Sequence, residues 1–258
     1  MITNISEDKL IVISDLHLGN PFCFSKRKII EFLSYIYEND YNLCINGDGF
    51  DIAQTSFVKL AKEVPEVFNQ FRRFEKKKLN VYYVIGNHDL VLEHFFEDWE
   101  LFTLTPFLNV TSQDLRVRIE HGHLYDPFFL KKPDLYEFCT HLAGYFLNIS
   151  PHLYKVWILF ERALGYYRQR KSKKNNLIGI LGEAASISEA AMMILERGFD
   201  AVVFGHTHHP GEVVLGHTHH PDEVEIRNLT YFNTGSWLMH TKYIEILNGD
   251  IALKTHEF

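Results

Sequence analysis

The first 90 residues of this chain alternate between strand-like and helix-like segments. Three short apolar runs suit buried parallel strands: 10–14, 41–45 and 81–85. Apolar residues recur with helical spacing over 26–38, and 56–78 are also expected to be helical. This βαβαβ order predicts a parallel sheet with helices on its faces. Ligands of such sheets gather beyond the carboxyl ends of the strands.

Five short motifs rich in metal ligands follow one another along the chain. They are Asp15-Leu16-His17, Gly47-Asp48, Gly86-Asn87-His88-Asp89, His121-Gly122-His123 and Gly205-His206-Thr207-His208. Asp15, Asp48 and Asn87 come one to three residues after a strand, so they are expected to converge at one edge of the sheet. Each motif alone is common in turns, but unrelated turns would not follow successive strands in this order.

Carboxylate, amide and imidazole donors together suit hard divalent cations and borderline transition metals, and no thiolate is needed. The expected metal ligands are Asp15, His17, Asp48, Asn87, His121, His206 and His208. Asp48 can bridge two ions through its two carboxylate oxygens. Two ions about 3.5–4 Å apart can hold both ends of an in-line displacement at phosphorus. We therefore expect hydrolysis of a phosphoric ester or anhydride by a metal-bridging hydroxide.

His88 directly follows the expected ligand Asn87 and is a candidate catalytic residue. A histidine beside a phosphoryl centre can donate a proton to the leaving oxygen. Asp89 or Asp51 could orient its ring by hydrogen bonding.

The second half of the chain is expected to form a second, mixed or antiparallel sheet. Two strands are expected within 107–121, and others follow at 201–204, 223–226, 230–233 and 243–247. The last continues through Asn248-Gly249 into 251–255, a strong hairpin signal. The predicted fold is a two-sheet α/β sandwich with helices outside.

Residues 126–198 form a different kind of segment, with aromatic-rich helical stretches and a basic run at 168–174. They are interpreted as a helical insertion over the edge that carries the motifs, within one domain spanning 1–258. An ordinary helical layer completing the core is an equal alternative. The basic run gives some support to contact with a membrane surface.

Composition narrows the class of protein. A net charge of −7 argues against a general nucleic-acid binder. No basic segment followed by an apolar run precedes the first strand, so a secretory signal is not expected. Three cysteines, an odd number at unrelated spacings, indicate reduced residues of a cytoplasmic protein.

The last motif occurs twice, and the two copies share eight of eleven positions. The first copy is 205–215 and the second copy is 216–226. The strand at 201–204 leads directly into the first copy, which favours His206 and His208 as ligands. Metal binding by His217 and His219 of the second copy, a mixed site and an extra metal site are the alternatives.

The five motifs resemble those of the calcineurin-like metallophosphoesterases over nearly the whole chain. The resemblance implies a four-layer α/β/β/α sandwich and two divalent ions, manganese foremost, with zinc, iron and cobalt as alternatives. It implies that one ion takes Asp15, His17, Asp48 and His208. It implies that the other takes Asp48, Asn87, His121 and His206.

Within that superfamily the chain most resembles the UDP-2,3-diacylglucosamine pyrophosphatases of lipid A biosynthesis. The shared features are chain length and an aromatic, partly basic insertion between the His121 and His206 motifs. In that group the insertion caps the site and holds acyl chains, and the substrate is a nucleotide lipid at the inner membrane surface. His88 departs from the group, because many of its members carry arginine there.

Two alternative functions remain open. One is a soluble phosphodiesterase or nucleotide phosphatase whose insertion only packs. The other is a non-catalytic scaffold that binds metal and a partner. The sequence leaves the native metal, the exact substrate and the oligomeric state open.

Overall fold

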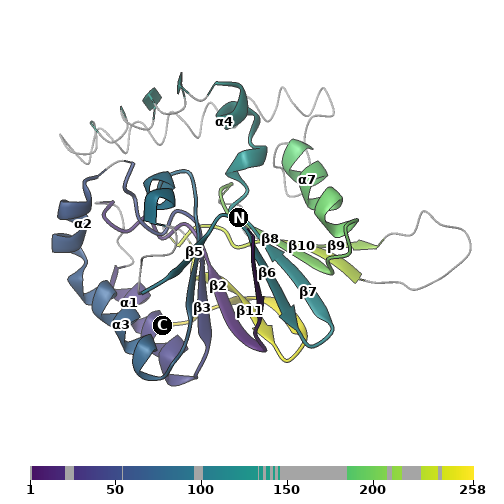
Figure 1. The fold of residues 1–258 in the computed structure, drawn as a ribbon, viewed down its shortest axis with the longest axis horizontal. Coiled ribbons are helices and arrows are strands. Elements are labelled where there is room, and N and C mark those ends of the chain that lie inside the picture. Colours follow the sequence, from purple (N-terminus) through teal and green to yellow (C-terminus); the bar gives the residue numbers. More distant parts are fainter. Residues whose placement is uncertain are drawn as a thin grey trace, which may run out of the picture.

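The computed structural model describes residues 2–20, 26–53, 55–95, 101–132, 185–207, 211–216, 228–237 and 240–258, with isolated positions between 134 and 145. These residues form two six-stranded sheets with helices on the outer faces (Figure 1). The predicted α/β two-sheet class is confirmed. The helical cap of that prediction falls mostly outside the described residues.

The first sheet has the order β12-β11-β2-β3-β4-β5. Its strands are β2 (Lys9–Ile13), β3 (Asn42–Asn46), β4 (Val81–Val84), β5 (Thr103–Thr105), β11 (Lys242–Leu247) and β12 (Asp250–Thr255). The strands β2 to β5 are parallel, as predicted for the first 90 residues. The predicted C-terminal hairpin β11–β12 forms, but its place in the second sheet was wrong. It joins the first sheet because β11 pairs antiparallel with β2.

The second sheet is mixed and has the order β1-β6-β7-β8-β10-β9. Its strands are β1 (Thr3–Ser6), β6 (Leu108–Ser112), β7 (Leu115–Ile119), β8 (Ala201–Phe204), β9 (Gly211–Gly216) and β10 (Asn228–Asn233). The strands β7, β8 and β10 are parallel to one another. Their carboxyl ends therefore lie at the same edge of the sheet.

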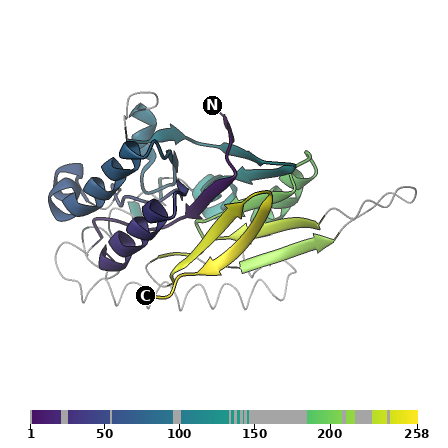
Figure 2. The same ribbon diagram turned by 90° about the horizontal axis from the view of Figure 1, so that it is seen from below.

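Figure 2 shows the strands with helices beside them. This layering follows from the alternation of side chains along each strand. Ile11 and Ile13 of β2 pack toward the helices α1 (Lys26–Glu38) and α3 (Pro65–Lys76). Leu10 and Val12 of the same strand pack in the cluster between the two sheets. On the far side, helix α7 (Ala185–Leu195) shares a buried cluster with residues of β8 and β10. The order of layers is α/β/β/α.

Helix α7 lies within the predicted insertion 126–198, but it packs as the outer layer of the second sheet. This part of the segment therefore follows the alternative of a helical layer completing the core. The short helix η2 (His123–Tyr125) directly precedes this segment, and α4 (Pro127–Lys131) lies at its start. Within the described ranges, no helix is both long and apolar enough for a membrane crossing.

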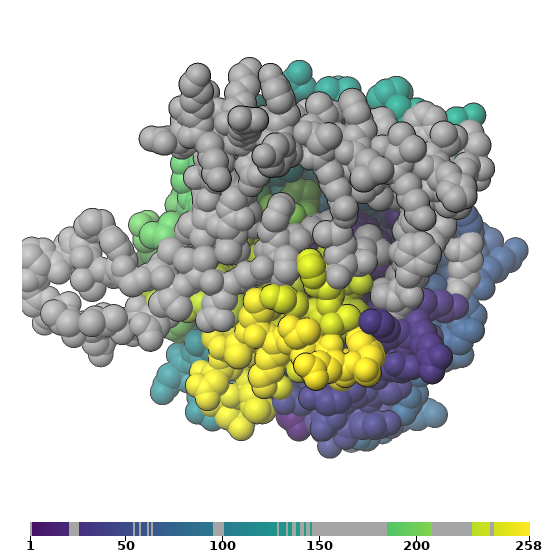
Figure 3. Space-filling model, turned by 180° about the vertical axis from the view of Figure 1, so that it is seen from behind, coloured from purple at the N-terminus to yellow at the C-terminus, as the bar shows by residue number. Residues whose placement is uncertain are grey.

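Two further short elements flank the motifs of the first sheet. They are α2 (Phe57–Glu63) and η1 (Leu90–Phe95). The C-terminal residues, yellow in Figure 3, lie beside the N-terminal helix α1, and the rings of Phe32 and His256 are 4.7 Å apart. This contact packs the C-terminal residues against the helical layer of the first sheet.

The strand β9 comes from the first copy of the repeated motif. Gly211 of β9 pairs with Asn233, and Gly216 pairs with Asn228. Asn233 also pairs with Phe204, the last residue of β8, so this end of β10 lies beside the fifth motif. The link from β9 to β10 starts at the other end of β10, where Gly216 pairs with Asn228. Sequence reasoning missed β9 and instead expected a strand at 223–226, which lies outside the described residues.

Candidate metal centre

The five motifs follow five strands whose carboxyl ends meet where the two sheets face each other. Asp15 and His17 follow β2, Asp48 follows β3, and Asn87 and His88 follow β4. His121 and His206 follow β7 and β8 of the second sheet. The amide of Asn46 joins the two sheets here, because it donates to the carbonyl oxygen of Glu120 at 2.9 Å. The predicted convergence at one edge is therefore present, and it includes both sheets.

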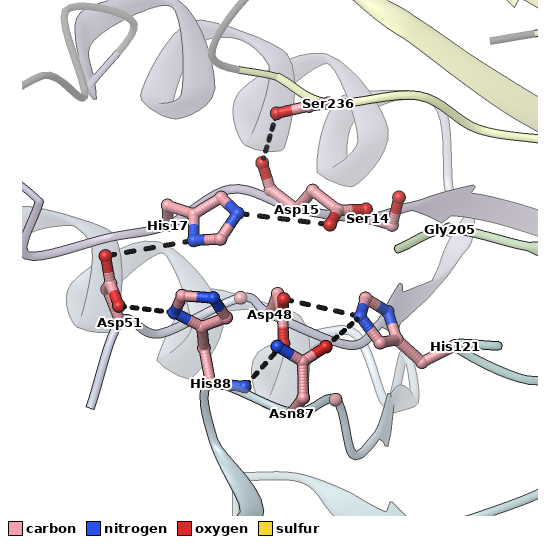
Figure 4. A network of polar contacts seen from close by, with 12 residues as sticks. Ser14, Asp15, His17, Asp48, Asp51, Asn87, His88, His121, Gly205 and Ser236 are labelled. Carbon is pink, nitrogen blue, oxygen red and sulfur yellow. Dashed lines mark hydrogen bonds and ion pairs between the residues drawn. The ribbon is translucent and has the colours of Figure 1, made fainter. Parts of the chain in front are cut away.

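Asp48 lies at the middle of this cluster (Figure 4). Its Oδ2 atom is 3.3 Å from Nε2 of His121, and its Oδ1 accepts the backbone N–H of His88 at 2.9 Å. The same Nε2 of His121 lies 3.2 Å from Oδ1 of Asn87. Donor atoms from three strands thus point at one another across a buried space.

The ring of His121 is fixed by the backbone of β3. Its Nδ1 donates to the carbonyl oxygen of Asn46 at 2.8 Å. Because Nδ1 is held as a donor, Nε2 is the nitrogen that can bind a metal once it has lost its proton. Sequence reasoning missed Asn46, whose only signal is its place at the end of β3.

Two groups of side chains have donor atoms close enough to share a cation. One ligand atom each of Asp15, Asp48 and His121 lie within 4.8 Å of one another. The same holds for His17, Asp48 and His88. Asp48 belongs to both groups, as a bridging carboxylate would.

The backbone of the candidate ligands is strained. Eight non-glycine residues of the described chain have positive φ, and four of them are candidate ligands. These are Asp15 (54°), His17 (46°), Asp48 (51°) and His206 (54°). Such a conformation costs about 1–3 kcal/mol per residue and is concentrated at functional sites. The fold therefore maintains these four side chains at a cost in stability.

Glycines make room for the same side chains. A Cβ atom on Gly86 would lie 2.2 Å from Oδ1 of Asp48. One on Gly47 would lie 2.3 Å from Nδ1 of His121. These positions accept only glycine without a shift of the candidate ligands.

The electrostatics of the site are dominated by buried carboxylates. Burial is the largest single influence on His121 and would lower its pKa, but the charges of Asp48 and Asp15 and the hydrogen bonds of the ring together raise that pKa to about 9. Burial also opposes protonation of His88, yet Asp48 and Asp51 raise its pKa to about 10. For Asp48, burial would raise the pKa, but the imidazoles of His121 and His88 lower it well below its usual value. A negative field of this kind attracts divalent cations.

His88 and the two acidic candidates around it have distinct contacts. Its Nδ1 lies 2.8 Å from Oδ1 of the fully buried Asp51. Asn20, which sequence reasoning missed, donates to the other oxygen of Asp51 at 2.9 Å. Asp89 instead accepts from the backbone N–H of Gly86 and from the hydroxyl of Tyr83. Asp51 therefore contacts the ring of His88, and Asp89 holds the loop that carries it.

The fifth motif is only partly described. His206 lies beside His121, with ring centroids 5.4 Å apart. Its Nε2 contacts Asp126 at 2.9 Å, a residue that sequence reasoning missed. The expected ligand His208 lies outside the described residues, as do His217 and His219 of the second copy.

These residues fit a pair of divalent cations. The donors are carboxylate, amide and imidazole groups, one carboxylate is common to both groups, and glycines leave space around them.

A pocket of about 80 Å³ adjoins the centre beside His121 and His123. Apolar side chains such as Ile85, Phe107 and Phe129 also line it. Burial lowers the pKa of His123 to about 3, so this ring is neutral at neutral pH. The pocket is suited to an uncharged or apolar group placed next to the centre.

Comparisons with solved structures find low-identity likenesses over most of the chain. A predicted phosphoesterase from Streptococcus pneumoniae is 14% identical, covers 97% of this chain and 91% of its own, and has a TM-score of 0.39. A protein of unknown function from Aquifex aeolicus is 13% identical over 78% of this chain and 79% of its own, with a TM-score of 0.39. A dimetal phosphatase from Danio rerio is 9% identical over 96% and 95%, with a TM-score of 0.48. Among curated proteins, none matches the chain significantly.

A comparison of the sequence with protein-family models identifies the family. The family model of the calcineurin-like phosphoesterases matches residues 9–210. That range contains all five motifs, including the first occurrence of the fifth at 205–208. The chain therefore belongs to the calcineurin-like phosphoesterase family.

Proposed function

We propose that this chain is a hydrolase that uses two divalent metal ions to cleave a phosphoric ester or anhydride. The observation that carries the proposal is the position of Asp48. Its carboxylate is 1% exposed and belongs to both groups of donor atoms. A shared carboxylate between two donor groups is the arrangement that a pair of ions requires.

The proposed ligands fall into two sets, which differ from the two donor groups because they pair Asp15 with His17 and assign His88 to proton donation. Asp15, His17, Asp48 and His208 would hold one ion, and Asp48, Asn87, His121 and His206 would hold the other. When bound, the ions would make a water molecule acidic enough to attack phosphorus and would neutralise charge on the phosphoryl oxygens. Manganese is the proposed metal, and zinc, iron and cobalt are the alternatives.

His88 is the proposed proton donor to the leaving oxygen. In the metal-free protein, the carboxylates of Asp48 and Asp51 raise the pKa of His88 to about 10 against the effect of burial. Asp51 is not a proposed metal ligand, so its carboxylate would continue to favour the protonated imidazole that a general acid needs. Asp51 orients the ring through its contact with Nδ1. The backbone N–H of His88 meanwhile holds Asp48 in place.

The proposed substrate is a nucleotide lipid that resembles UDP-diacylglucosamine, cleaved at its pyrophosphate. Large apolar side chains are exposed along the segment that follows His121, and the pocket beside that residue is lined mostly by apolar groups. These exposed side chains are Leu124 (38%), Leu130 (57%), Leu135 (43%), Phe138 (61%) and Tyr145 (62%). They would suit acyl chains or the surface of the cytoplasmic membrane, where such a substrate would be held.

A hydrolysis panel in the presence of Mn²⁺ tests this substrate class. It compares a UDP-linked diacyl sugar, its deacylated form, simple nucleotides and a chromogenic phosphodiester. We expect the highest kcat/KM for the acylated compound. Equal turnover of the deacylated form would contradict the lipid substrate and favour a soluble phosphodiesterase or nucleotide phosphatase. An absence of turnover with every metal would favour a scaffold.

A further inference from the structure

Asp126 contacts the tip of the His206 ring from a different part of the chain. Its Oδ2 lies 2.9 Å from Nε2 of His206, and the two residues are 80 positions apart. Asp126 is itself fixed between η2 and α4. Its N–H donates to the carbonyl oxygen of His123 at 3.1 Å, and its carbonyl oxygen accepts the N–H of Leu130 at 3.0 Å.

This contact determines which nitrogen of His206 carries the proton. An ionised carboxylate can only accept hydrogen bonds, so Nε2 must be the donor. In the neutral imidazole the lone pair is then on Nδ1. His121 has the opposite arrangement, because its Nδ1 donates to the carbonyl oxygen of Asn46. The two neighbouring histidines thus present different nitrogens for binding.

The backbone on the other side of His206 is also held in place. The N–H of Gly205 donates to the carbonyl oxygen of His121 at 3.0 Å. Asn233 donates to the carbonyl oxygen of Gly205 and to the hydroxyl of Thr207, each at 2.9 Å. With both the backbone and the ring tip fixed, the side chain of His206 has little freedom to turn. These contacts also hold the first copy of the repeated motif at the site.

We propose that Asp126 is a positioning residue that keeps His206 in the Nε2–H tautomer and directs its Nδ1 toward the metal centre. The inference rests on the proposed metal site, in which His206 is a ligand. A carboxylate that orients a ligating histidine typically changes metal affinity by about 10–100-fold. Asp126 is partly exposed, and its effect is expected on affinity and tautomer rather than on folding.

The first test is the tautomer of His206 in metal-free protein. Long-range ¹H–¹⁵N spectra of histidine-labelled protein distinguish the two neutral forms, and His206→Gln identifies the signal. We expect the proton on Nε2. A neutral His206 that carries it on Nδ1 would overturn the proposal, whatever the variants do.

The second test is Mn²⁺ binding to Asp126→Asn, which keeps the shape of the side chain. The amide can donate to Nε2 and so stabilise the wrong tautomer. We expect one of the two ions to bind at least about tenfold more weakly, with the other unchanged. The matched control is Asp134→Asn, an exposed residue eight positions further along, which should bind like the wild type.

A wrong metal site and a wrong role for Asp126 would give different results. If His206→Gln binds both ions with wild-type affinity, His206 is not a ligand and the proposed metal site is wrong at this position. If His206→Gln weakens one ion while Asp126→Asn does not, the metal site stands and the role of Asp126 is refuted. A loss in Asp126→Asn with the Nε2–H signal retained would also refute it.

Discussion

Nδ1 of His88 lies 2.8 Å from Oδ1 of Asp51, so a fully buried carboxylate holds the imidazole of the third motif. The two residues come from different loops, one after β3 and one after β4. Oδ2 of Asp51 also lies 3.8 Å from Nδ1 of His17, a proposed metal ligand. Asp51 therefore links the proposed proton donor to the proposed metal centre.

Replacing His88 should reduce chemistry more than metal binding. For His88→Gln we expect kcat to fall by about 10²–10⁴, the usual contribution of a general acid. Metal content should remain that of the wild type, because the ring of His88 is not among the proposed ligands. Parallel measurements of kcat and bound metal separate the two effects. A loss of both ions would show that His88 is needed for metal binding instead.

Gly86→Ala should weaken metal binding by steric overlap alone. The new Cβ would overlap Oδ1 of Asp48 at 2.2 Å, and Asp48 would have to move. We expect at least about a tenfold loss of metal affinity, comparable to that of other changes around a ligand. The control is Gly249→Ala in the β11–β12 turn, where φ is +87°.

Gly249→Ala should lower the melting temperature because that backbone conformation disfavours alanine. Its metal affinity should stay at the wild-type value, since the turn lies away from the motifs. Calorimetric titration of both variants with Mn²⁺ makes the comparison. Equal affinities in Gly86→Ala and the wild type would contradict the proposed position of Asp48.

The two copies of the last motif should differ in importance. His206→Ala should abolish turnover and lower metal content, whereas His217→Ala should have a much smaller effect. The reason is that β8 leads directly into the first copy, while Gly216 pairs with Asn228 at the opposite end of β10. Metal analysis and kinetics of both variants test this. Unchanged values for His206→Ala would mean that the first copy does not serve the site.

Metal binding should stabilise the folded protein. At a free Mn²⁺ concentration of about 100 times Kd, each site contributes about 2.7 kcal/mol. For a chain of this size, each bound ion therefore raises the melting temperature by roughly 5–10 °C. Chelation should reverse the rise, and Asp48→Asn should show little of it. A melting temperature that does not respond to Mn²⁺ would contradict a folded metal site.

The parallel part of the fold was predictable because its signals are local. Each of β2, β3 and β4 is a short apolar run followed by a candidate ligand, and α1 has a clear helical period. The placement of β11 was not predictable from such signals. The hairpin is evident from Asn248-Gly249, but its partner β2 lies at the other end of the sequence, so its sheet depends on tertiary packing.

Site residues could be predicted from the sequence where the type of side chain itself indicates metal binding. Asp48 and His121 were predicted as ligands in this way, and the structure brings Oδ2 of Asp48 to 3.3 Å from Nε2 of His121. Asn46 was not, because it acts on His121 through its backbone carbonyl oxygen, which every residue has. Asp126 was also missed, since a single aspartate before a proline is ordinary at the start of a helix. The strand β9 was missed, because both copies of the repeat end in similar strand-forming residues and the prediction placed a strand only in the second copy, at 223–226.

The most direct test of a two-metal phosphoesterase is the number of ions bound by the active protein. Mn²⁺-loaded wild type and Asp48→Asn are compared for metal content by elemental analysis and for hydrolysis of a chromogenic phosphodiester. We predict two ions per chain with turnover for the wild type, and loss of both ions and of turnover for Asp48→Asn. An active wild type with one ion, or an Asp48→Asn variant that keeps both ions and its turnover, would contradict the account.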